Sequence, residues 1–226
     1  MVKTDEYSQL ELRGLTRRGG VAGAVLVLNG APLDELHAAT ALSSALADSS
    51  LLVAVDGGLE TCRAGRRHPD LFVGDVDSTR LQADGIPTVI FERDKGFSDL
   101  AGALEEIHKR GVQLVTVAGL LGGRLDHEWA NLQELGSHAS HVASLLAPTK
   151  RGLVLITRHG CRLATVPDRT VSVFSQGSTA TVTLLGTRWE LRRRRLKIGS
   201  QGLSNLTGSA FDLRVHQGTV AVVFVA

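Results

Sequence analysis

The sequence predicts an α/β protein, with an N-terminal Rossmann-like parallel sheet flanked by helices followed by a smaller all-β sandwich or barrel domain. Up to about residue 150, short apolar runs alternate with stretches of helical periodicity, the pattern of βαβ units. Beyond that point, β-rich runs follow one another without a strong helix signal, separated by Gly, Asp, Ser and Asn. We therefore expect an α/β domain over residues 21–150 and an all-β domain over residues 151–226.

The elements of the first part follow from periodicity. Residues 51–55 form a continuous apolar run, as expected for a parallel strand covered on both faces. Residues 97–110 carry Leu100, Leu104 and Ile107 on one helical stripe. The expected strands are 24–28, 51–55, 71–73, 88–91 and 114–117, and the expected helices are 33–47, 97–110 and 126–135.

The elements of the second part are recognised by alternation and by β-branched residues. The expected strands are 152–156, 161–166, 170–174, 179–184 and 219–225. Residues 138–149 are interpreted as a helix end and a linker.

Composition limits the classes of protein. The chain has 43% hydrophobic and 21% charged residues, ordinary values for a globular core. No run approaches the ~18 apolar residues of a membrane span, and residues 1–20 hold no apolar stretch like a secretory signal, so we expect a cytoplasmic protein without membrane association. The net charge of +2 argues against a nucleic-acid binder. We interpret the arginines at 192–195 as a solvated face, because no aromatic residues interleave with them.

Acidic residues follow four of the expected parallel strands. They are Asp56 after strand 51–55, Asp75 and Asp77 after strand 71–73, Asp99 after strand 88–91, and Asp126, with Arg124, after strand 114–117. Ligands of open α/β sheets bind along the edge where parallel strands end. The five carboxylates are therefore expected to converge on one crevice.

Asp75 and Asp77 indicate a metal site. In extended backbone, residues two apart face the same side, roughly 7 Å from one another. Their mutual repulsion is relieved by a hard cation, most simply Mg²⁺, held by carboxylates, water and phosphate oxygens. Gly57, Gly58, Gly74, Gly122 and Gly123 allow close approach to a phosphate, and Arg124 can clamp one.

Single residues of this set have ordinary alternatives. Asp56, Ser98, Asp99 and Asp126 each fit the simpler role of a helix cap or turn residue. Their conjunction at one sheet edge favours a site. His127 lies where it can touch a substrate, and the histidines at 138 and 141 show no third metal ligand in the sequence, but for each of the three we favour a solvated or helix-capping role.

These stretches together resemble the thiamine pyrophosphokinase (thiamin diphosphokinase) family over roughly residues 24–226. The matching stretches are Leu28-Asn29-Gly30, Val55-Asp56-Gly57-Gly58, Pro69-Asp70, Gly74-Asp75-Val76-Asp77-Ser78, Ser98-Asp99, the 122–127 run Gly-Gly-Arg-Leu-Asp-His with Ala130-Asn131, and Gly202-Leu203-Ser204-Asn205.

The resemblance implies an enzyme that moves a pyrophosphoryl unit from ATP to the hydroxyl of thiamine, giving thiamine diphosphate and AMP. It implies a homodimer with the active site at the interface. By match, Asp75, Asp77 and Asp99 hold Mg²⁺; Asp56, Gly57, Ser98 and Arg124 line the ATP and phosphate site; Asp126 orients thiamine; and Ser204, Asn205 and Trp189 contact thiamine. Asp75, Asp77, Asp99 and Asp126 are the catalytic set.

The chain departs from the family at four positions. The family usually has Phe at Val76, Thr at Ser98 and acids at Ala101 and near Gly96. The missing acids leave metal count and nucleotide preference open. The alternatives are a related diphosphokinase acting on another small alcohol such as a hydroxymethylpterin, a catalytically silent binding protein, and a nucleic-acid binder through residues 192–195.

Overall fold

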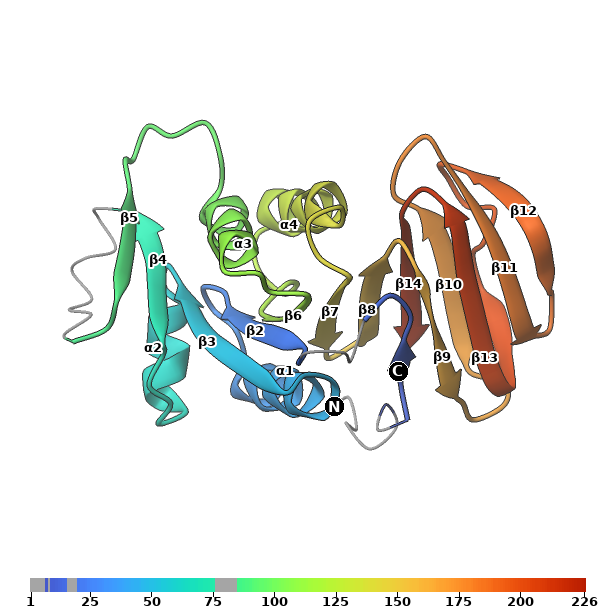
Figure 1. The fold of residues 1–226 in the computed structure, drawn as a ribbon, viewed down its shortest axis with the longest axis horizontal. Helices are drawn as coiled ribbons and strands as arrows, with labels where there is room; N and C mark the ends of the chain where they lie inside the picture. The colour runs from blue at the N-terminus through green and yellow to red at the C-terminus, as the bar shows by residue number, and fades with distance from the viewer. Residues whose placement is uncertain (1–6, 8, 16–19, 76–84) are drawn as a thin grey trace.

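The protein is built around one continuous mixed sheet (Figure 1). A computed structural model describes residues 7, 9–15, 20–75 and 85–226. The strands are β1 (Glu11–Leu12), β2 (Ala22–Val27), β3 (Ser49–Val55), β4 (Leu71–Asp75), β5 (Thr88–Phe91), β6 (Leu114–Ala118), β7 (Ser144–Thr149), β8 (Gly152–Thr157), β9 (Gly160–Ala164), β10 (Thr170–Ser175), β11 (Thr179–Thr187), β12 (Leu191–Lys197), β13 (Asn205–Gln217) and β14 (Val220–Val225). The helices are α1 (Leu33–Leu46), α2 (Gly58–Ala64), α3 (Asp99–Lys109) and α4 (Leu125–His138).

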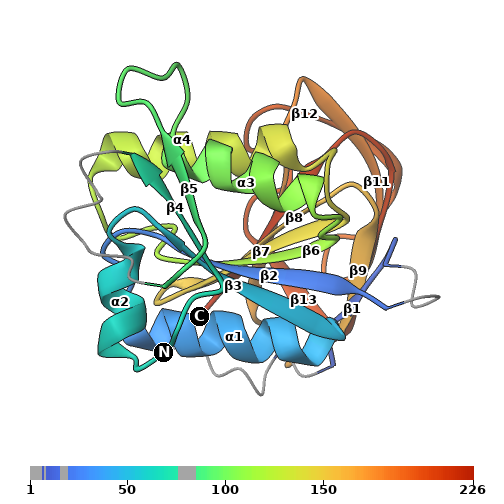
Figure 2. The ribbon, with the colours of Figure 1, turned by 60° about the vertical axis from the view of Figure 1, so that its left-hand side comes forward.

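The strands of the first half run parallel, in the order β7-β6-β2-β3-β4-β5. Alternate residues of β2 face opposite sides of this sheet, as the strand period requires. Val25 and Val27 join the core that α1 and α2 cover, whereas Ala24 and Leu26 join the core under α3 and α4. Figure 2 shows α1 along one side of the strands and α3 with α4 along the other.

The sheet becomes antiparallel at the hairpin between β7 and β8, where Thr149 pairs with Gly152. From β8 it continues through β14, β10, β13 and β9 to β1, with β11 and β12 as further strands. This half has its own core, which includes Phe211, Phe224 and the buried Tyr7 of the N-terminal segment.

The predicted fold class was wrong. Of the described residues, 42% lie in strands and 23% in helices, so the structure is mostly β. The parallel strands are one portion of a single 14-stranded mixed sheet rather than a Rossmann-like sheet flanked by helices. Because the hydrogen bonding passes through the β7–β8 hairpin, the sheet crosses residue 150 without a break. The division into functional domains at that residue stays a prediction.

Three strands that the sequence did not indicate explain much of this difference. β7 lies in the stretch interpreted as helix end and linker, yet all of its residues are buried. β12 contains the arginine run, and its exposed charges hide the alternation that marks a strand. β13 pairs with three strands and shifts register, so no simple period marks it.

None of the helices in the described part of the chain has the length and apolar character of a membrane span. The longest of them have 14 residues.

Close packing at the start of α2 requires a glycine. Gly58 is buried, and a Cβ at this position would clash with the backbone carbonyl oxygen of Val27 in β2. Since the obstacle is backbone inside a sheet, a side-chain rotation cannot relieve it. Gly58 therefore lets α2 lie directly against the ends of β2 and β3.

We expect Gly58→Ala to lower the free energy of unfolding by about 2 kcal/mol or more, because the added methyl overpacks a rigid contact. Urea unfolding followed by circular dichroism measures this. Gly177→Ala is the matched control, since a Cβ there meets nothing within 4 Å. Equal stability of the two variants would show that β2 and α2 separate at little cost.

Candidate functional site

A cleft of about 400 Å³ lies at the edge of the sheet where the parallel strands end. Residues that follow β2, β3 and β6 form its floor, and the first turns of α3 and α4 form its walls. Its lining comprises Leu28, Asn29, Gly30, Val55, Asp56, Ser98, Asp99, Leu100, residues 119–124, His127, Glu128 and Asn131. All of these residues lie within residues 21–150, the part of the chain that contains the parallel strands.

Asp56 occupies a strained turn at the floor of the cleft. Its φ of +49° lies in the left-handed region, which few residues other than glycine adopt. The backbone N–H of Asp56 donates to the carbonyl oxygen of Val73 at 2.8 Å, which ties this turn to β4. Strained non-glycine residues concentrate at functional sites, so this conformation supports a binding role for Asp56.

Ser98 and Asp99 open α3 at the cleft wall. The Ser98 hydroxyl accepts a hydrogen bond from the N–H of Ala101 at 3.1 Å, which makes Ser98 the N-cap of the helix. Asp99 Oδ1 is buried and accepts no well-oriented hydrogen bond, although the ammonium of Lys95 lies 3.0 Å away. The Lys95 side chain is itself only 9% exposed and lies near the Phe91 and Phe97 rings.

Side chains of α4 and of α1 hold the loop that follows β6, residues 119–124. Glu128 of α4 accepts a hydrogen bond from the N–H of Gly122, and Asn131 donates to the carbonyl of Leu120 at 3.2 Å. Both bonds leave from the face of α4 that borders the cleft. The glycine loop is thus a defined backbone surface beside the helix N-terminus, where N–H groups suit an anion.

Glu35 anchors the same loop from beneath. Its side chain is 4% exposed and accepts hydrogen bonds from Gly119 N–H at 3.0 Å and from Lys150 N–H at 3.3 Å. Burial raises the pKa of Glu35 above its ordinary value of 4.5, and the two backbone hydrogen bonds partly offset that increase.

Arg124 and Asp126 form an ion pair at the rim of the cleft. Nε and one terminal nitrogen of Arg124 donate to the two carboxylate oxygens of Asp126, at 3.1 and 2.6 Å. This hydrogen bonding lowers the pKa of Asp126 and raises the pKa of Arg124. Both side chains are exposed, so a phosphate can replace Asp126 as the partner of Arg124, and a second substrate can replace Arg124 as the partner of Asp126.

The structure brings together part of the set predicted for ATP and metal. Asp56, Ser98, Asp99 and Arg124 line the cleft, and Gly57 lies against the Asn29 side chain beside it. Asp75 is the last residue of β4 at the same sheet edge, outside the described walls of the cleft. Asp77 lies outside the described residues.

The residues predicted for thiamine are not in this cleft. Trp189 is 56% exposed beyond the end of β11, and Arg188 lies over its ring at 5.4 Å. The Asn205 amide is buried and bonds the backbone N–H and carbonyl of Trp189 at 3.1 and 2.8 Å. Asn205 therefore positions Trp189, and Ser204 is exposed next to it.

The sequence alone indicated no role for several residues at the site. Burial or loop contacts give roles to Lys95, Glu35 and Glu128, and a local sequence pattern does not reveal such contacts. Asn29 and Asn131 belong to the motifs that match the family, but the sequence assigned them no role.

The oxygen donors of the cleft fit a magnesium ion. Asp56 and Asp99 supply carboxylates, Asp75 ends the neighbouring strand, and Mg²⁺ prefers such ligands together with phosphate and water. The buried Oδ1 of Asp99, without a well-oriented hydrogen bond, is consistent with a cation ligand. Lys95 already supplies one positive charge at this oxygen.

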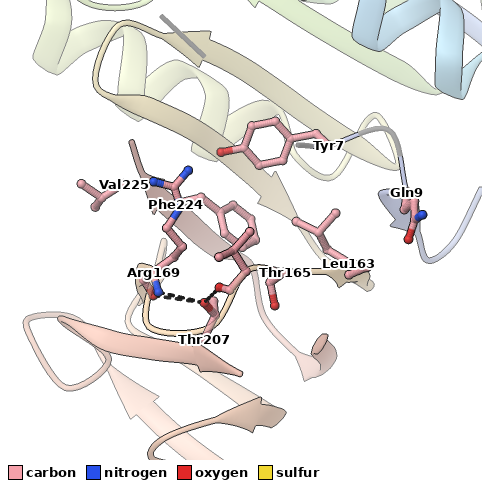
Figure 3. A pocket seen from close by; sticks show the side chains of 10 residues that line it. Tyr7, Gln9, Leu163, Thr165, Arg169, Thr207, Phe224 and Val225 are labelled. Carbon is pink, nitrogen blue, oxygen red and sulfur yellow. Dashed lines mark hydrogen bonds between the residues drawn. The ribbon is translucent and has the colours of Figure 1, made fainter. Parts of the chain in front are cut away.

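A second cavity, of about 320 Å³, lies between the N-terminal segment and the antiparallel half (Figure 3). Tyr7, Leu163 and Phe224 make it largely apolar, with Arg169 at one side. Its described lining contains no carboxylate, no glycine loop and none of the predicted site residues. The chemistry of phosphate transfer therefore points to the first cleft.

Comparison with known proteins agrees with this placement. Residues 42–145 match the family described as thiamin pyrophosphokinase, catalytic domain. That segment contains most of the cleft. No curated protein matches the chain.

Solved structures share the fold over most of the chain. Thiamine pyrophosphokinase from Bacillus subtilis superposes with a TM-score of 0.72 at 18% identity, covering 91% of this chain and 99% of the other. The enzyme from Geobacillus thermodenitrificans gives 0.69 at 19% identity, with 91% and 98% covered. The one from Candida albicans gives 0.70 at 14% identity, with 91% and 90% covered. The match over residues 42–145 confirms the resemblance to this family that the motifs indicated, and the solved structures show that the fold is shared.

We expect Glu35→Gln to lower the free energy of unfolding by about 1–3 kcal/mol, because an amide offers one acceptor oxygen for two N–H groups. The difference depends on pH. The pKa of Glu35 is higher in the folded chain than in the unfolded chain. Its protonation therefore stabilises the fold below pH 4.5, and this contribution is lost as pH rises through the folded pKa.

Urea unfolding at several pH values between 4.5 and 7.5 checks the sign. The excess stability of the wild type over Glu35→Gln is expected to shrink as pH rises. The exposed Glu60 of α2 supplies the control Glu60→Gln, which should show no comparable trend. An excess that grows with pH would contradict the assignment.

Proposed function

We propose that this chain, which has the motifs and the fold of the thiamin pyrophosphokinase family, transfers the diphosphoryl group of ATP to the hydroxyl of thiamine, giving thiamine diphosphate and AMP. The observation that carries the proposal is the cleft at the carboxyl edge of the parallel strands. It combines Asp56, Asp99, a braced glycine loop and Arg124 within the segment that matches the catalytic-domain family.

The cleft suits phosphate transfer, which depends on positioning and charge neutralisation more than on a strong base. In the proposed complex, N–H groups of the 119–124 loop and of the α4 N-terminus bind phosphate oxygens. Arg124 leaves Asp126 and clamps a phosphate with two hydrogen bonds. Asp126, released from Arg124, then accepts a hydrogen bond from the acceptor molecule.

Magnesium would be held by Asp75, Asp77 and Asp99, where it would neutralise developing phosphate charge. The ammonium group of Lys95 lies beside the carboxylate of Asp99 and balances its negative charge. With Gly96 and Ala101 in place of two acids usual in the family, we propose that the Lys95–Asp99 pair limits the number of ions that bind.

The acceptor site is proposed to form between two copies of the chain. Trp189, Ser204 and Asn205 are absent from the cleft of their own chain. Beside that cleft, Leu125 and Trp129 on α4 are 80% and 67% exposed, an apolar surface that a second copy could cover. A homodimer would thus bring residues of the antiparallel half of one chain to the cleft of the other.

The first test is AMP release from ATP and Mg²⁺, with and without thiamine, with the product identified by mass. We expect AMP and thiamine diphosphate to appear together and only when thiamine is present. If a hydroxymethylpterin supports AMP release and thiamine does not, the acceptor assignment is wrong. If no alcohol supports it while ATP still binds, the chain is a binding protein.

We expect Asp99→Asn to lower kcat by about 100-fold or more, because it removes a carboxylate ligand of the proposed magnesium ion that neutralises phosphate charge. Asp75→Asn should act in the same direction. Steady-state AMP release measures both. Asp94→Asn changes an exposed carboxylate of the loop before α3 and is the matched control, expected to keep wild-type rates. Near-normal turnover by Asp99→Asn would show that Asp99 is not a ligand of the proposed magnesium ion.

A further inference from the structure

A cluster of imidazoles and carboxylates lies where α3 and α4 end, away from the cleft. It contains Glu105 and His108 of α3, His138 at the end of α4, and His141 just beyond. The two helices lie side by side and run in the same direction (Figure 2). Since α4 has 14 residues, His138 lies roughly 20 Å along the helix from the end that borders the cleft.

Three of these side chains are placed to share one ion. One ligand atom from each of Glu105, His138 and His141 lies within 4.8 Å of the others. The His141 Nδ1 and the Glu105 carboxylate are 3.8 Å apart. The sequence showed two histidines three positions apart and no third ligand. The packing of α3 against α4 supplies it.

Hydrogen bonds fix the Nδ1 side of two rings, and for His138 this leaves Nε2 for binding. His138 Nδ1 lies 2.9 Å from the carbonyl oxygen of Glu134, and only a protonated Nδ1 can donate to it. His108 Nδ1 has the same relation to the carbonyl of His141, at 3.1 Å. A metal-bound histidine characteristically donates its other ring N–H to such a carbonyl or carboxylate. His138 therefore presents the lone pair of Nε2.

The His141 ring is supported by aromatic contacts. His108 stacks on it with centroids 4.6 Å apart and an interplanar angle of 24°, and His138 meets it edge-on at 5.6 Å. The two nearest cations of α3, Lys109 and Arg110, both pair with Glu106. Glu105 thus faces the histidines.

Electrostatics at this point favour a cation. The C-terminal ends of α3 and α4 converge here, and the aligned peptide dipoles of each helix place a partial negative charge at that end. Glu134, whose carboxylate is 3.5 Å from His138 Nδ1, adds a further negative charge behind the ring.

The donor set indicates the class of ion. Two imidazole nitrogens and one carboxylate oxygen suit a borderline transition metal and do not suit Mg²⁺ or Ca²⁺, which prefer oxygen alone. Zinc bonds of about 2.0–2.1 Å would require the ligand atoms to approach closer than they now lie. The side chains of Glu105 and His141 are 46% and 40% exposed, which leaves them room to rotate.

We propose that Glu105, His138 and His141 form a zinc site that joins the C-terminal ends of α3 and α4, with water completing the coordination. His108 and Glu134 act as positioning residues through the contacts described above. This site is independent of the proposed phosphate transfer, since none of these residues lies in the cleft.

The test is calorimetric titration of the untagged, EDTA-treated and dialysed chain with ZnCl₂. One equivalent of zinc is expected to bind the wild type. His138→Gln and His141→Gln should each weaken binding about 10-fold or more, as loss of even an outer ligand contact does. His37→Gln alters an exposed histidine on α1, on the other side of the sheet, and should bind like the wild type.

Thermal unfolding gives a second readout that does not depend on enzymatic activity. Equimolar ZnCl₂ should raise the Tm of the wild type and of His37→Gln but not of His141→Gln, because an ion that binds only the folded state stabilises it. MgCl₂ at the same concentration should have no such effect. Absence of zinc binding by the wild type, or equal binding by all three variants, would overturn the proposal.

Discussion

The carboxylate of Glu35 is a constraint on which the organisation of this molecule depends. It is buried in α1 and bonded to the N–H groups of Gly119 and Lys150. Gly119 begins the loop that forms part of the floor of the cleft, and Lys150 lies in the hairpin where the sheet changes from parallel to antiparallel. A buried charge is tolerated only with such partners. One side chain therefore ties a helix, the candidate site and the junction of the two halves together.

The second organising feature is the parallel pair of helices α3 and α4. Their N-termini border the cleft, where unpaired N–H groups and side chains such as Ser98 suit anionic ligands. Their C-termini meet at the histidines, where the negative ends of the two helix dipoles suit a cation. Helix polarity alone thus assigns opposite ligand charge to opposite ends of the same two elements. A cation at the far end would restrain the helices that carry Asp99 and Arg124.

Much of the parallel half could be predicted from sequence, because each buried strand is a compact apolar run and each acidic turn follows it directly. The antiparallel half was harder. β12 reads as a charge run, since as an outer strand it exposes its arginines, and β7 follows a helix end without a turn signal of its own. Trp129 lies on one helical stripe with Leu132 and Leu135, the spacing typical of a buried face, yet it is 67% exposed, because only contacts from other elements decide which stripe is covered.

The sequence by itself determined the family resemblance and the placement of Asp56, Ser98, Asp99 and Arg124 at the ends of strands, because strand period and chain direction are local properties. Only the tertiary structure decided that these four line one cleft, that Lys95 pairs with Asp99, and that the amide of Asn205 is committed to Trp189. It also decided the β-dominated class and the meeting of Glu105 with His141. Most of these contacts join residues distant in sequence, and their distances are set by the packing of whole elements. The Lys95–Asp99 pair is only four residues apart, yet it depends on the conformation of the loop before α3, which no simple period predicts.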